Sequence, residues 1–216
     1  MAAMDQAKLS SMCSNVNSAA GQYVSGVNSD VEKLTDAFNQ AWVSQSSKQE
    51  AVKITTTLSQ LAQGIQSVFA SKNEDIANHV SAFNSLENES ISYQGFTFGT
   101  PNVTVTLNAT LPNGKVGVAD GASIEAITNP FDTLVANVET NLNQVSSSVK
   151  SSDAFDDKEQ AAMTSGIEKT VTNFVNAMAQ IKQSVRQAFQ QEEQTRTSYD
   201  ATAESNLSST TDVTVE

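Results

Sequence analysis

The chain has 216 residues, of which 38% are hydrophobic and 17% charged, and its 12 Lys and Arg against 24 Asp and Glu give a net charge of −12. This acidic balance, without a basic cluster, argues against nucleic acid and anionic lipid as partners. The single cysteine and single histidine are too few for a thiol dyad or a metal centre built on these ligands. We therefore expect a protein that is not an enzyme and that needs no cofactor or metal.

The apolar residues of the first segment recur at steps of three and four, which predicts a helix from about Asp5 to Trp42. The residues on this stripe are Leu9, Val16, Ala20, Tyr23, Val27, Val31, Leu34 and Phe38. Gly21 and Gly26 interrupt the pattern, and each costs up to about 1 kcal/mol relative to alanine inside a helix. These glycines mark either close packing against another helix or local looseness of this helix, and we expect close packing.

A bend is expected near residues 42–47, because three serines there can cap a following helix. Ser47 and Glu50 match the spacing of a capping box. The second helix then runs to about Leu86. Residues 1–90 are therefore predicted to form a first helical hairpin.

Between residues 91 and 122 the period of the apolar residues changes to two. Val103, Val105 and Leu107 alternate with polar residues, and Asn113-Gly114 is a turn signal between two strands. We predict a β-hairpin in which this strand pairs with a strand around residues 116–118. The insertion also contains three aromatic residues, Tyr93, Phe96 and Phe98. They belong either to a structured connector or to a recognition or insertion tip.

Residues 123–206 are predicted to form a second helical hairpin that repeats the first, with its turn near residues 151–157. At an offset of 113 positions, Ile54, Leu58, Leu61 and Ile65 fall on Ile167, Val171, Phe174 and Met178. At an offset of 111, Val16, Ala20, Val27, Val31, Leu34 and Phe38 fall on Ile127, Phe131, Val138, Leu142, Val145 and Val149. Trp42, the only tryptophan, corresponds to Phe155.

These elements predict an all-α protein, an elongated antiparallel four-helix bundle built from two tandem hairpins with a small β-hairpin insertion between them. Residues 207–216 are read as a disordered tail. The apolar runs are far shorter than the roughly 20 residues that a membrane span needs. The first 20 residues also lack the apolar stretch of a cleavable signal peptide.

The bend sequence Trp42-Val43-Ser44 between two long helices resembles the Trp-X-Gly (WXG) superfamily of helical hairpins exported by type VII secretion systems. Ser44 occupies the position of the family's glycine. In that family the Trp and Gly lie in the turn, and a tyrosine followed four residues later by Asp or Glu, next to the turn of a partner hairpin, signals export. The candidate here is Tyr199, although Glu204 follows it by five residues.

The resemblance implies a bacterial protein that is secreted without a cleavable signal and acts by binding other proteins, either the secretion machinery or a cognate effector that it escorts. Because family members pair as dimers of hairpins, two hairpins in one chain imply an intramolecular pseudo-dimer, which can be a monomer. Two alternatives remain open. The chain can be a component of an α-helical pore-forming toxin with a β tongue, or a subunit of a filament or needle tip.

Overall fold

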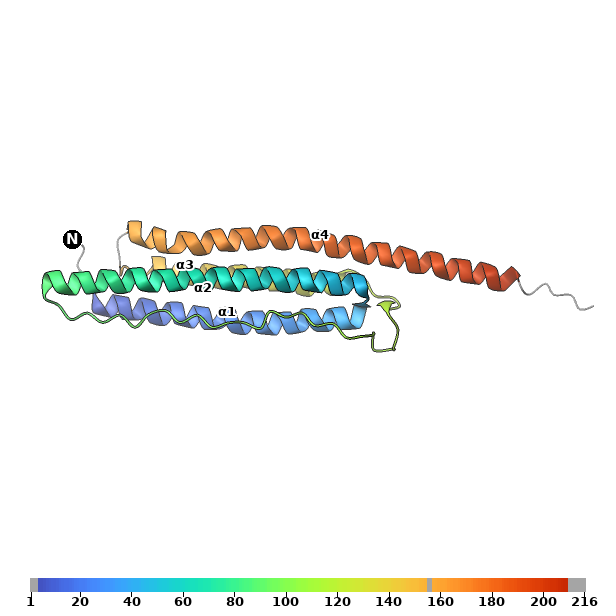
Figure 1. Ribbon diagram of the computed structural model, residues 1–216, viewed down its shortest axis with the longest axis horizontal. Coiled ribbons are helices and arrows are strands. Elements are labelled where there is room, and N and C mark those ends of the chain that lie inside the picture. The colour runs from blue at the N-terminus through green and yellow to red at the C-terminus, as the bar shows by residue number, and fades with distance from the viewer. Residues whose placement is uncertain (1–3, 155–156, 210–216) are drawn as a thin grey trace, which may run out of the picture.

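The computed structural model describes residues 4–154 and 157–209, and its long helices lie side by side in an elongated bundle (Figure 1). The helices are α1 (Gln6–Ala41), α2 (Gln45–Glu87), α3 (Glu125–Lys150) and α4 (Asp157–Ser209). Helix α1 packs on α3, α2 packs on α4, and α3 also packs on α4. The predicted all-α, antiparallel four-helix fold is confirmed.

The core consists of the apolar stripes that the sequence repeats. Every residue of the predicted α1 stripe, Leu9 to Phe38, is at most 2% exposed, and the corresponding stripe of α3, Ile127 to Val149, is at most 3% exposed. The matching stripes of α2 and α4 are buried as well. A helix that buries one face in this way gains most of its stability from that packing.

Close packing explains some of the helical glycines. A Cβ atom on Gly26 would lie 3.1 Å from Nδ2 of Asn141, and one on Gly166 would lie 3.2 Å from both γ-carbons of Val68. The interpretation of Gly26 as a packing position is therefore confirmed. For Gly21 it is wrong, because a Cβ atom there would meet nothing within 4 Å.

An extended segment, residues 91–108, runs lengthwise along α1 and α2 (Figure 1); we call it the strap. It is hydrogen-bonded to side chains of both helices, and we call the space between them that it fills the α1–α2 groove. The predicted alternation is present, since Val105 is buried and Val103 and Leu107 are partly buried, while Thr104 and Thr106 are exposed. However, the strap forms no strand in the described structure, because its main chain is hydrogen-bonded mainly to side chains of α1 and α2, which replace a neighbouring strand.

The predicted pairing of the β-hairpin is therefore wrong, although a small two-stranded antiparallel sheet exists. It is formed by β1 (Trp42–Val43) and β2 (Gly117–Val118), with Trp42 opposite Val118. The turn at Asn113-Gly114 is present, since the Gly114 N–H donates to the Leu111 carbonyl over 2.9 Å. The strand that leaves this turn pairs with the α1–α2 bend instead of returning along the strap.

Two predicted boundaries also differ. Because residues 42 and 43 are extended and paired with β2, α2 begins at Gln45, and its capping box is formed by Ser44 and Ser47, not by Ser47 and Glu50. Helix α4 continues to Ser209, so residues 207–209 belong to the helix and not to the tail. Residues 210–216 and Phe155 lie outside the described residues. Among the described helices, none has a stretch long and apolar enough to cross a bilayer.

Candidate interaction site at the Trp42 bend

The Trp42 side chain closes one end of the bundle. It is 0% exposed, stacks on Phe38 with ring centroids 6.0 Å apart, and meets the edge of Phe189 at 5.6 Å. Phe189 belongs to α4, so the bend of the first hairpin packs directly on the last helix of the second. The main chain of the bend is held on its other side by β2.

Glu192 of α4 joins the bend to the second hairpin through two hydrogen bonds to one carboxylate oxygen. Nε1 of Trp42 donates to Oε2 of Glu192 over 2.8 Å, and Oγ of Ser44 donates to the same oxygen over 2.7 Å. Ser44 also caps α2, since its Oγ accepts from the Ser47 N–H. Ser44 therefore provides both a donor to Glu192 and an acceptor for the first turn of α2.

Helix α4 extends beyond this bend, past the ends of the other helices (Figure 1). Its side chains there include Arg196, which pairs with Asp120 in the loop after β2, and Tyr199, which is 76% exposed. Tyr199 follows Glu192 by seven residues, or about 10 Å along a helix. The structure thus places Tyr199 at the same end of the bundle as Trp42. Glu204 is exposed further along the projecting helix.

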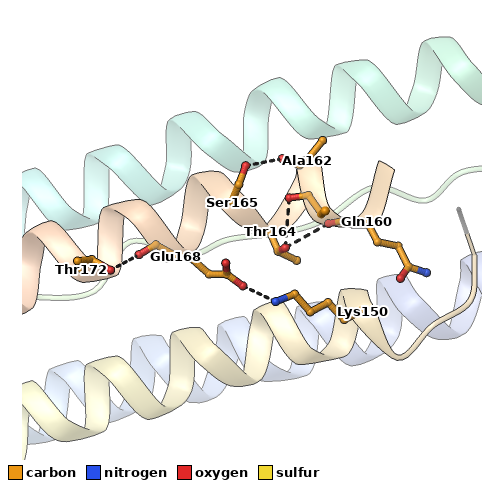
Figure 2. A network of polar contacts seen from close by, with 8 residues as sticks. Lys150, Gln160, Ala162, Thr164, Ser165, Glu168 and Thr172 are labelled. Carbon is orange, nitrogen blue, oxygen red and sulfur yellow. Dashed lines mark hydrogen bonds and ion pairs between the residues drawn. The ribbon is translucent and has the colours of Figure 1, made fainter. Parts of the chain in front are cut away.

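The second bend lies at the opposite end of the bundle, and Phe155, the predicted counterpart of Trp42, is outside the described residues. Figure 2 shows the polar contacts beside this bend. Lys150 at the end of α3 pairs with Glu168 of α4 over 2.5 Å. The hydroxyl groups of Thr164 and Thr172 donate to carbonyls of their own helix. Of these contacts, the Lys150–Glu168 pair is the one that joins α3 to α4.

The three aromatic residues of the insertion do not form a projecting tip. Phe96 is buried and Tyr93 and Phe98 are partly buried, because the strap directs them into the α1–α2 groove. Phe98 lies 5.2 Å from the Tyr23 ring of α1 and 4.6 Å from the Phe69 ring of α2, measured between ring centroids. Burial raises the pKa of the Tyr23 and Tyr93 phenols well above the ordinary value. Whether these aromatics recognise a partner stays a prediction.

Within residues 4–154 and 157–209, no cluster of three or more His, Cys, Asp or Glu side chains is arranged to hold a metal ion. Cys13 is buried and its pKa is raised, mainly by desolvation.

Sequence reasoning missed Glu192, the residue that completes the bend. No local signal distinguishes it from its neighbour Glu193, because its role depends on a residue 150 positions away. The chain matches no protein-family model, no curated protein and no solved structure. Its function must therefore be argued from the geometry of the bend and of the strap.

Proposed function

We propose that this chain is a secreted or secretion-associated protein of the WXG type, which binds a protein partner as an export substrate or as the escort of an effector and catalyses no reaction. The observation that carries the proposal is the hydrogen bond from Trp42 to Glu192. It joins the bend of one hairpin to the last helix of the other, which is the arrangement that the resemblance implies for two paired hairpins.

The surface offered to a partner is the projecting part of α4 and not the tryptophan. Trp42 and Val43 are both 0% exposed, so they shape the end of the bundle without touching a partner. Tyr199 is a large side chain exposed at the same end of the bundle, as is Val116 next to β2. Asp200 and Glu204 are also exposed there, and their carboxylates favour a basic partner surface.

An export assay tests this proposal. The full chain is expressed in a bacterium that carries a type VII system, with and without an active secretion motor, and the protein is quantified in cells and medium. We expect motor-dependent export that Tyr199→Ala reduces to background at an unchanged cellular level. The matched control is Thr195→Ala, which changes an exposed residue one turn earlier. Export that persists after Tyr199→Ala and after deletion of residues 194–216 contradicts the proposal.

A pore-forming component is the second candidate, favoured by one observation. The segment from Ile91 to Gly114 contains no charged residue. Several of its apolar side chains pack in the α1–α2 groove. If this segment enters membranes, the intact protein releases dye from liposomes, and Phe96→Asp with Phe98→Asp abolishes the release. An intact protein that causes no leakage at any pH excludes this candidate.

A further inference from the structure

The groove between α1 and α2 holds an extended segment in an unusual way. Helix α1 packs on α3 and α2 packs on α4, and the strap runs lengthwise along α1 and α2 (Figure 1). In the described part of the chain, the main-chain groups of the strap bond to side chains and to no other main-chain group. The groove therefore binds the strap through side chains of its two walls.

The α1 wall presents one carboxamide every 11 residues. The main-chain N–H groups of Ser92, Thr97, Asn102 and Asn108 donate over 2.6 to 2.7 Å to the side-chain oxygens of Gln6, Asn17, Asn28 and Asn39, respectively. Eleven helical residues rise about 16.5 Å, which equals five extended residues at about 3.3 Å each. The intervals from Ser92 to Thr97 and from Thr97 to Asn102 have this length, whereas the interval from Asn102 to Asn108 has six residues, so the strap takes one extra residue to reach Asn39.

The α2 wall works in the same way. Asn84 donates to the carbonyl of Ile91 over 2.7 Å and accepts from its N–H over 2.9 Å. Asn73 forms the same pair of bonds with Phe96, over 2.9 and 2.7 Å. The Thr55 hydroxyl accepts from the Val105 N–H over 3.0 Å. A carboxamide can donate and accept at once, so it replaces one residue of a neighbouring strand.

These contacts define the kind of segment that the groove accepts. Bonds to the main chain do not depend on the side chains of the bound segment, as in recognition by strand addition. Selection comes from the residues that point inward, because Phe96, Pro101 and Val105 are buried and Val103 and Leu107 are partly buried. The ligating side chains of both walls are uncharged, and so is the strap. The fitting ligand is an extended, uncharged segment whose apolar residues alternate with small polar ones.

We infer that the α1–α2 groove is a binding site for such a segment of a protein partner, and that the strap occupies it in the absence of the partner. The strap is bounded by turns, with Asn88 at φ 57° before it and Gly114 at φ 78° after it, so it can leave while the helices stay intact. This inference does not depend on export, because a chain that is never secreted has the same groove.

A peptide exchange experiment tests the inference. A fluorescent peptide of residues 91–108 is titrated into the full chain, and its anisotropy is followed to equilibrium. In the variant Phe96→Ser with Phe98→Ser the chain's own strap is weakened but the groove is unchanged. We expect this variant to bind the peptide at least about tenfold more tightly than the unaltered chain. A peptide with Asp at both phenylalanine positions is expected not to bind.

The matched control is Thr104→Ser with Thr106→Ser, which changes only the exposed face of the strap and leaves peptide affinity unchanged. A folded Phe96→Ser, Phe98→Ser chain that fails to bind the peptide overturns the inference, as does equal binding of the Asp-containing peptide.

If that variant does not fold, amide hydrogen exchange of the unaltered chain tests whether the strap can leave the groove while the helices stay folded. The N–H groups of Phe96, Asn102 and Val105 must exchange faster than those inside α1 and α2. Equal rates mean that the strap leaves only when the whole protein unfolds, which also overturns the inference.

Discussion

The strongest stability prediction concerns Asn73, whose side chain connects α2 to the strap. Its Oδ1 accepts from the Phe96 N–H over 2.7 Å and from the Tyr93 hydroxyl over 2.6 Å, and its Nδ2 donates to the Phe96 carbonyl over 2.9 Å. The change Asn73→Ala removes all three bonds. The substitution leaves the main-chain N–H and carbonyl of Phe96 and the hydroxyl of Tyr93 without these protein partners.

The magnitude follows from the number of bonds. Three hydrogen bonds at about 1 kcal/mol each give a loss of about 3 kcal/mol. Alanine is the better helix former, which returns about 0.5 kcal/mol. We therefore expect Asn73→Ala to lower the free energy of unfolding by about 2.5 kcal/mol.

Urea unfolding followed by circular dichroism measures this change. Asn143→Ala is the matched control, because Asn143 is exposed in the middle of α3 and its replacement changes helix propensity alone. A double-mutant cycle of Asn73→Ala with Tyr93→Phe should give a coupling energy of about 1 kcal/mol. If Asn73→Ala is no less stable than Asn143→Ala, the strap is not held by these bonds and the reasoning is refuted.

Four further substitutions test the bend, the helix packing and the buried phenol of Tyr23. Glu192→Gln should cost about 1.5 kcal/mol, because two donors lose a charged acceptor, and should shift the emission of Trp42. Gly21→Ala should add about 1 kcal/mol of stability, whereas Gly166→Leu should cost about 1–3 kcal/mol by overpacking; urea unfolding measures both. Burial raises the pKa of the Tyr23 phenol above that of an exposed tyrosine. The stability that the buried, neutral phenol contributes is therefore complete below pH about 10, and it is lost as the pH rises above that value, because the unfolded chain then releases the phenol proton first. Unfolding measured at rising pH should show this loss, and Tyr23→Phe should reduce it.

The predictions for Glu192, Gly21 and Tyr23 each have a defined contradiction. Glu193→Gln makes the same charge change beside the bend, so an equal effect of both variants would mean that charge and not the hydrogen bonds matters. A destabilising Gly21→Ala would show that the glycine is needed for a contact absent from this structure. A Tyr23→Phe chain with the same loss of stability in alkali would assign that loss to other groups.

The helices and the core could be predicted because the periodic pattern that predicts them is local. The stripe from Leu9 to Phe38 is buried as expected, since an amphipathic helix of this length must cover its apolar face. The duplication also located the matching stripe of α3. Both depend on residues three to four positions apart, which one sequence displays.

The partners of the strap and of Trp42 could not be predicted, because they lie far away in the sequence. Alternating apolar residues predict an extended, half-buried segment, and the strap is one. They do not predict what its main chain binds, and pairing with the next strand is the ordinary solution. One signal was present, since Gln6, Asn17, Asn28 and Asn39 recur every 11 residues, but polar residues on a helix surface usually face water.

In the part of the chain that the structure describes, the same spacing distinguishes α1 from α3. At the offset of 111 that aligns α1 with α3, Asn17, Asn28 and Asn39 correspond to Thr128, Glu139 and Lys150. The last of these is an ion-pair partner of Glu168 (Figure 2). A carboxylate only accepts and an ammonium only donates, so neither can both donate to and accept from an extended main chain. Helix α3 therefore lacks the carboxamides that bind the strap on α1, and it packs directly on α4. The two hairpins share their apolar stripes. They differ in the polar residues at the positions that bind the strap on α1.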